Sequence, residues 1–284
     1  MLYAVRLARS ICDIITVRMQ FLKLVRRRSF LSELTYTALN IALAIGVALI
    51  VCYTESTGLA ILLVLISKWR VLAVRPRYWW ANVRSNMVDF IVGASIAVHI
   101  NTVNLASLGD ATKLWLIIAL TVAYIVWLLF IKPRSKRSYV VAQSSIATFL
   151  GMSALFIVAY NWPLSIVVVL AWLIGSSASY HILSAYDNET QGFLLSLFVG
   201  VFFAELSWVA YHWAIAYPLP FFPALMVPQV AIITTLIGFL AYKAYDSFYH
   251  HSKIRLSDIL LPLLLTVSVL LVLLVLFNRV GTAI

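Results

Sequence analysis

Residues 258–277 read DILLPLLLTVSVLLVLLVLF, and apart from Asp258 this stretch contains no charged side chain. A helix of about 20 mainly apolar residues covers roughly 30 Å, the thickness of the hydrocarbon core of a bilayer. The stretch is therefore typical of a membrane-spanning helix. The whole chain shares this character, because 63% of its 284 residues are hydrophobic and only 11% are charged. A soluble domain has about 25% charged residues, so the sequence predicts an integral membrane protein.

Similar apolar segments recur along the chain, and we predict an all-α polytopic transmembrane bundle. About nine spans are expected, near residues 34–53, 57–74, 86–108, 113–131, 139–160, 163–184, 191–216, 224–243 and 257–278. The segment 57–74 is the weakest because it contains Lys68 and Arg70, whose long stems we expect to reach the interface. Residues 34–284 are thus predicted to form one transmembrane helical domain.

The distribution of lysine and arginine predicts the orientation. With the N-terminus inside, the inner segments are 1–33, 68–85, 132–138, 185–190 and 243–256. These segments hold 19 of the 21 basic residues, and only Lys113 and Arg279 lie outside. We therefore expect an inner N-terminus and an outer C-terminus. This bias also accounts for the net charge of +11, so no nucleic-acid partner is expected.

The first 33 residues carry a basic, amphipathic helical pattern. Polar side chains repeat at alternating steps of three and four, at Arg6, Arg9, Asp13, Thr16, Gln20, Lys23 and Arg27. This pattern predicts an interfacial helix over residues 1–33 that lies on the lipid bilayer and contacts anionic inner-leaflet lipids. An alternative interpretation is a docking helix for a membrane protein partner, and a homo-oligomer is also compatible with the sequence.

Glu205 stands within the apolar run VGVFFAELSWVAYHW (199–213). An ionised carboxylate near the centre of a span costs about 2.5–3.5 kcal/mol, so such residues usually face the bundle interior. His99 has a matching predicted depth in another span, His212 shares the face of Glu205, and Asn101 lies close to His99 in the sequence. One hypothesis is a protonatable site, with Glu205 neutral at rest and a histidine exchanging protons. The alternative is a neutral Glu205 that hydrogen-bonds another span and fixes helix packing.

A second polar group occurs in WWANVRSNMVDF (79–90). Asn82, Asn86 and Asp89 share one helical face, and Arg84 lies nearby. These residues could bind a lipid headgroup or another anion. The alternative is an ordinary interfacial helix start, with Asn86 as a cap and Asp89 at the positive end of the helix dipole.

Two other features are read more simply. His181 and the pair His250-His251 have no set of metal ligands around them, so they are read as solvated, and neither a metal nor a cofactor is expected. The proline-rich segment YPLPFFPALMVP (217–228) is expected to form a stiff interfacial cap, with Pro228 kinking the start of the next span.

The function classes can be weighed from motifs. The sequence lacks a Gly-x-Ser-x-Gly elbow, paired zinc-binding histidines, a dense acidic cluster and a phosphate-binding glycine loop, so an enzyme is not expected. We expect a non-catalytic membrane component, such as a scaffold or an assembly subunit of an envelope complex. The alternative is a proton- or ion-coupled transporter that uses Glu205 and His99.

Two runs carry a family resemblance. WWANVRSNMVDFIVGAS (79–95) and AELSWVAYHWAIAYPLPFFP (204–223) resemble an uncharacterised family of multi-spanning membrane proteins from reduced-genome candidate-phylum bacteria. The resemblance implies a multi-pass protein of the bacterial cytoplasmic (inner) membrane. It implies no activity and no site residues.

Overall fold

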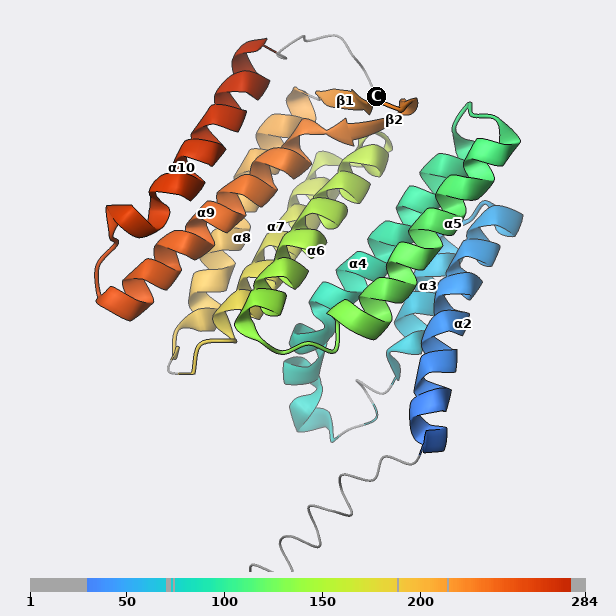
Figure 1. Cartoon of the computed structure of the whole chain (residues 1–284), viewed down its shortest axis with the longest axis horizontal. Helices are drawn as coiled ribbons and strands as arrows, with labels where there is room; N and C mark the ends of the chain where they lie inside the picture. Colours follow the sequence, from blue (N-terminus) through green and yellow to red (C-terminus); the bar gives the residue numbers. More distant parts are fainter. Residues whose placement is uncertain (1–29, 70–72, 74, 188, 214, 277–284) are drawn as a thin grey trace, which may run out of the picture. The chain divides into compact units, whose positions relative to one another are not determined.

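The computed structural model describes residues 30–69, 73, 75–187, 189–213 and 215–276 (Figure 1). The interfacial helix predicted for residues 1–33 lies almost wholly outside this range. The chain divides into two compact units, Met1–Ala42 and Leu43–Ile284. In the first unit, the described residues form the beginning of helix α2 (Phe30–Thr54). The rest of α2 and every later element belong to the second unit.

The second unit is built from helices and one small hairpin. Its α-helices are α3 (Thr57–Ser67), α4 (Trp79–Leu105), α5 (Asp110–Val126), α6 (Arg137–Val158), α7 (Leu164–Leu183), α8 (Gly192–His212), α9 (Gln229–His251) and α10 (Leu256–Leu271). Short 3₁₀ turns cover Pro76–Tyr78 and Ala159–Asn161, and π-helical segments cover Trp127–Ile131 and Val272–Leu276. The strands are β1 (Ala216–Leu219) and β2 (Phe222–Pro228).

Seven helices in the described part of the chain are long and apolar enough to cross a membrane. The chain is therefore a multi-pass helical membrane protein. The seven segments are Ser32–Thr54, Pro76–Leu105, Asp110–Ile131, Arg137–Asn161, Leu164–Leu183, Gly192–His212 and Leu256–Val275. The nine predicted spans also included 57–74 and 224–243, and neither of these corresponds to one of the seven.

These two segments differ from the prediction for separate reasons. Helix α3 has 11 residues and is about 16 Å long, well short of a hydrocarbon core. The segment 224–243 is divided, because residues up to Pro228 form strand β2 and α9 begins at Gln229.

The described part of the chain is the predicted helical bundle, and the proline-rich segment adds one feature that was not predicted, an antiparallel hairpin. Ala216 pairs with Pro228 and Tyr217 pairs with Val227, with an irregularity between Pro218 and Leu219. Proline has no N–H donor, which disfavours a helix here but is tolerated on the edge strands that make up a two-stranded sheet. Pro228 precedes α9 as its N-cap and does not kink the helix.

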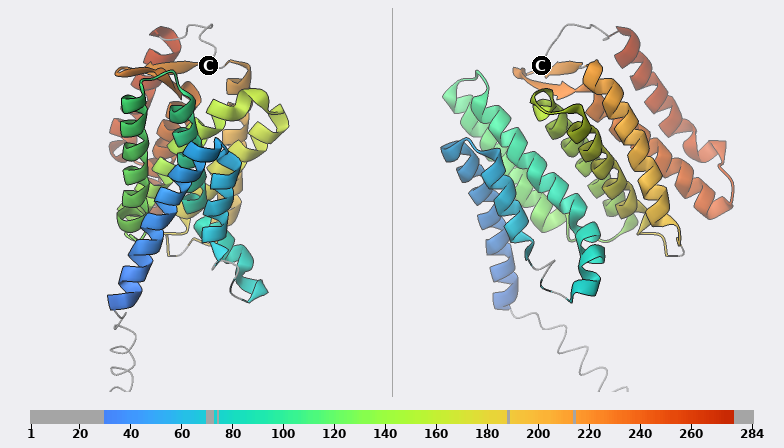
Figure 2. Two further views of the ribbon diagram at one scale, coloured as in Figure 1. Left: turned by 90° about the vertical axis from the view of Figure 1, so that its right-hand side faces the viewer. Right: turned by 180° about the vertical axis from the view of Figure 1, so that it is seen from behind.

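The connections of the second unit gather at two ends (Figures 1 and 2). We call one the basic end; its described residues are 68–69, 73, 75–78, 132–136, 184–187, 189–191 and 252–255, which largely coincide with segments predicted on the inner side. The other is the hairpin end, where β1 and β2 lie near the turn between α6 and α7 (Figure 2). Charged and polar contacts concentrate at the basic end.

Small residues allow α7 and α8 to pack closely. A Cβ atom on Gly175 would lie 2.4 Å from Phe203 Cγ, and a Cβ on Gly200 would lie 2.9 Å from the Trp172 carbonyl oxygen. Such close approach is typical of membrane helix pairs with small residues at their interface. The close packing determines which face of α8 is buried. The buried residues of this face are Gly192, Ser196, Gly200, Phe203 and Ser207.

Candidate functional site

A buried charged cluster lies at the basic end. The Asp89 carboxylate pairs with Lys68 and with Lys132, whose Nζ lies 2.6 Å from Asp89 Oδ2. Trp127 Nε1 donates a hydrogen bond of 2.9 Å to Asp89 Oδ1. Three segments therefore meet at one carboxylate: the end of α3, the middle of α4 and the end of α5. The group carries two positive charges and one negative charge.

This arrangement corrects two expectations. Lys68 was expected to extend to the interface, but its ammonium group turns inward and binds Asp89. Asp89 was expected near a helix start, but α4 begins at Trp79, so Asp89 lies ten residues, or about 15 Å, inside the helix. A carboxylate at that depth is stabilised by its cations rather than by the helix dipole, which acts within the first turn.

The residues of the proposed headgroup or anion site do not form one site, because their side chains contact different parts of the protein. The Asn86 side chain donates to the Asn82 carbonyl oxygen at 2.8 Å, inside the same helix, so it is not a cap. The Arg84 guanidinium carbon lies 4.5 Å from the Tyr180 ring centre and 4.5 Å from that of Phe193. Asp89 belongs to the charged cluster described above. The anion hypothesis therefore now depends on Arg84.

Arg84 itself lies among aromatic rings. Its third aromatic neighbour is Trp80, with the ring centre 5.7 Å from the guanidinium carbon, and its Nε is buried without a hydrogen-bond partner among the described residues. Cation–π contacts of this kind contribute about 0.5–2 kcal/mol each. The arrangement joins α4 to α7 and α8 at the basic end.

His99 and Asn101 lie on α4 but face different surroundings. His99 interacts with the backbone of Leu150 in α6, and its Nε2 is buried without a hydrogen-bond partner in the described part of the chain. Asn101 Oδ1 is likewise buried and unpaired there. Residues two positions apart on a helix point in directions about 200° apart, so the side chains of His99 and Asn101 do not converge on one site.

Glu205 does not lie in the bundle interior. Its side chain is exposed on α8, and within the described residues it makes no ion pair or hydrogen bond with His99. The contact between Glu205 and His99 that their matched depth made possible is therefore absent among the described residues. His212 is exposed too, and its ring meets the ring of Trp208 edge-on with centres 5.2 Å apart.

The exposed face of α8 has a regular composition. It follows spacings of four and three residues through Leu194, Phe198, Val201, Glu205, Trp208 and His212. Phe198 is 66% exposed and Trp208 is 53% exposed. Spacings that alternate between four and three place all six side chains on one helical face, which we call the α8 seam; Glu205 and His212 are its polar members.

Two polar contacts at the basic end were not anticipated. Gln143 Nε2 donates to the carbonyl oxygens of Ile131 at 2.7 Å and Arg134 at 3.0 Å, which lie at the end of the π-helical segment and in the turn after it. Its Oε1 lies 2.7 Å from His181 Nε2, so His181 is partnered by protein rather than simply solvated. No sequence spacing signals this contact, because Gln143 and His181 are 38 residues apart.

The second unanticipated group centres on Asp246. Tyr186 donates a hydrogen bond of 2.8 Å to Asp246 Oδ1, and Arg137 approaches the same oxygen at 3.4 Å. The Arg137 guanidinium carbon also lies 4.3 Å from the Tyr186 ring centre. Burial and the bond to Asp246 raise the pKa of the Tyr186 phenol, so it remains a donor at neutral pH. The group ties the loop after α7 to α6 and α9.

Among the described residues, no group of three or more histidine, cysteine, aspartate or glutamate side chains is placed to hold a metal ion. Comparisons with protein-family models, with curated proteins and with solved structures found no match. The interpretation of the site therefore rests on the geometry of this chain.

Proposed function

We propose that this protein is a non-catalytic membrane component, a scaffold or assembly subunit that docks a transmembrane helix of a partner protein on the exposed face of α8. The bacterial cytoplasmic membrane is the proposed location, on the basis of the family resemblance. The observation that carries the proposal is the exposed Glu205 in the α8 seam, whose other residues apart from His212 are apolar.

The energetic argument starts from the position of Glu205. It lies 13 residues after Gly192, about 20 Å along a helix that is roughly 30 Å long. A carboxylate facing lipid at such depth costs a few kcal/mol, up to about 3.5 kcal/mol at the centre of a span. A partner helix with a hydroxyl, amide or cationic side chain at the same depth would offset that cost by hydrogen bonding. The face of α8 that packs on α7 is already occupied, so the partner must contact the opposite face.

The contacts of the other polar groups are consistent with this role. Asp89, Gln143 and Asp246 all join helices of the same chain at the basic end. Such groups hold the unit together, whereas Glu205 has no partner in the described part of the chain. The alternative function, proton- or ion-coupled transport with Glu205 and His99, requires the two residues to share a site. Their separation favours the scaffold.

Photo-crosslinking in native membranes tests the proposal. A photoreactive amino acid at Phe198 or Val201 should crosslink to one discrete protein, because both positions lie on the seam. The matched control is Leu261 on α10, which is 78% exposed and should crosslink only to lipid. Glu205→Leu should abolish the protein crosslinks without changing the amount of protein in the membrane. Lipid adducts alone at all three positions would refute the docking role.

A further inference from the structure

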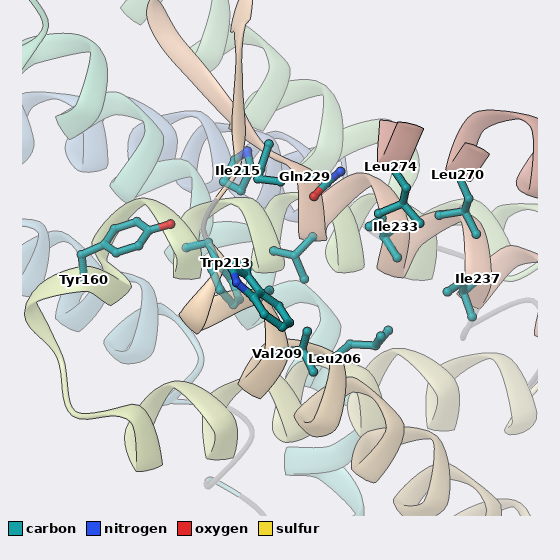
Figure 3. A pocket seen from close by; sticks show the side chains of 14 residues that line it. Tyr160, Leu206, Val209, Trp213, Ile215, Gln229, Ile233, Ile237, Leu270 and Leu274 are labelled. Atoms are coloured by element: carbon teal, nitrogen blue, oxygen red, sulfur yellow. The ribbon is translucent and has the colours of Figure 1, made fainter. Parts of the chain in front are cut away.

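A cavity of about 570 Å³ lies beneath the hairpin, lined by residues of α6, α8, α9 and α10 and of the segments that adjoin them (Figure 3). Its lining is almost wholly apolar and includes Phe156, Leu206, Val230, Ile233, Ile237 and Leu270. Binding sites for small molecules have volumes of roughly 300–1,000 Å³ and mostly apolar walls, so the cavity has the dimensions of a ligand site.

The cavity has a closed wall and an open side. Phe156 and Val230, on the wall, are 1% and 5% exposed, whereas Trp213 on the α8 side and Leu274 on the α10 side are 65% and 49% exposed. In Figure 3, Trp213 lies between Tyr160 on one side and the α10 leucines on the other. The opening therefore lies on the lateral, apolar surface of the unit. In a multi-pass membrane protein this surface faces the acyl chains of the bilayer.

Polar groups occur at one end of the cavity. Gln229, the first residue of α9, donates its backbone N–H to the Ile215 carbonyl at 2.8 Å, and its side-chain Nε2 lies 3.4 Å from the Leu273 carbonyl. The second polar side chain of the lining is Tyr160, whose hydroxyl points toward this space (Figure 3). Ile237 lies eight residues beyond Gln229, about 12 Å farther from the hairpin along α9. The cavity is thus polar near the hairpin and apolar deeper in the bundle.

We propose that this cavity binds one acyl chain of a bilayer phospholipid. The carboxyl end of the chain lies near Gln229 and Tyr160 at the hairpin end, and the methyl end extends toward Ile237 and Leu206. The lateral mouth allows the chain to enter from the bilayer while its headgroup stays at the membrane surface. This proposal uses a different surface from the α8 seam and stands independently of the docking role.

Position-specific photolabelling of the full-length protein tests the assignment. The protein is reconstituted into phosphatidylcholine vesicles that contain one of two diazirine-labelled phosphatidylcholines, with the diazirine near the carboxyl end or near the methyl end of the acyl chain. Adducts are mapped by mass spectrometry. The carboxyl-end probe should label residues around Val230, and the methyl-end probe should label residues around Ile237 and Leu206.

A substitution that fills the cavity provides a second test. Ala210→Trp places an indole in the cavity and should abolish both sets of adducts, whereas Ala142→Trp, at an exposed position on α6, should leave them unchanged. Identical labelling by the two probes, or adducts spread evenly over the exposed apolar surface, would overturn the proposal. The comparison of the two probes on the wild-type protein remains decisive even where Ala210→Trp does not fold.

Discussion

Asp89→Leu is expected to destabilise the protein through charge rather than through shape. The substitution removes the single carboxylate between Lys68 and Lys132 and leaves two ammonium groups beside each other. Breaking a buried ion pair from one side costs about 3–5 kcal/mol, because the remaining charge is uncompensated. The Lys132 side chain is 29% exposed and is partly screened by water. We therefore expect the free energy of unfolding to fall by about 3 kcal/mol, the lower end of that range.

Two further variants separate charge from packing. Lys132→Met leaves a neutral Lys68–Asp89 pair and should change the free energy of unfolding by less than about 1 kcal/mol. The triple variant Asp89→Leu, Lys68→Met, Lys132→Met has no charge in the cluster and should return to within about 1 kcal/mol of wild type, since apolar replacement of a whole buried ion pair is often neutral or stabilising.

The free energies of unfolding can be measured for all three variants by intrinsic tryptophan fluorescence during titration of detergent-solubilised protein with sodium dodecyl sulfate. We expect the single variant Asp89→Leu to be far less stable than Lys132→Met, the triple variant and the wild type. A triple variant as unstable as Asp89→Leu would refute the electrostatic reasoning, because it would show that the shape of Asp89, rather than its charge, is what the cluster requires.

Two other predictions concern packing and capping, and the same titration checks both. Gly175→Ala would place a methyl group 2.4 Å from Phe203 Cγ and should lower the free energy of unfolding by about 1–3 kcal/mol. Gly58→Ala, whose methyl group would make only an ordinary contact 3.8 Å from Ser56 Oγ, should raise it by up to about 1 kcal/mol. Equal effects of the two changes would contradict the close α7–α8 packing. Gln143→Leu removes the donor to the Ile131 and Arg134 carbonyl oxygens and the partner of His181, and should lower the free energy of unfolding by about 1–3 kcal/mol. An unchanged value would show that water replaces both contacts.

The sequence predicted the helical membrane class and the gathering of basic segments, because both depend on composition over long windows. The described residues of 68–85 and 132–138, two segments predicted on one side, lie at one end of the second unit, where Lys68 and Lys132 both pair with Asp89. Their convergence on Asp89 could not be predicted, since an ion pair between residues 21 positions apart leaves no periodic signal. The hydrophobic pattern finds helices but does not say which helix contacts which.

Glu205 shows why the candidate site was harder to predict. The desolvation penalty of a carboxylate argues for an inward position, whereas the stripe Gly192, Ser196 and Gly200 argues that α8 buries its small-residue face. The structure follows the small residues, because close packing against α7 needs a face without bulky side chains. Reading the stripe first would have placed Glu205 outward. The hairpin was missed for a different reason, since four prolines within twelve residues indicate only that a helix is disfavoured.

The charged cluster at the basic end also bears on the order in which the chain is made. Lys68 and Asp89 leave the ribosome close together, so the short helix α3 can enter the bilayer with its charge neutralised only once α4 accompanies it. Lys132 follows 43 residues later, after α5 has been synthesised. Lys132 is therefore the last member of the cluster to be made. A translation pause or truncation between Asp89 and Trp127 would leave α3 and α4 with one positive and one negative charge in the cluster but without the Trp127 hydrogen bond to Asp89.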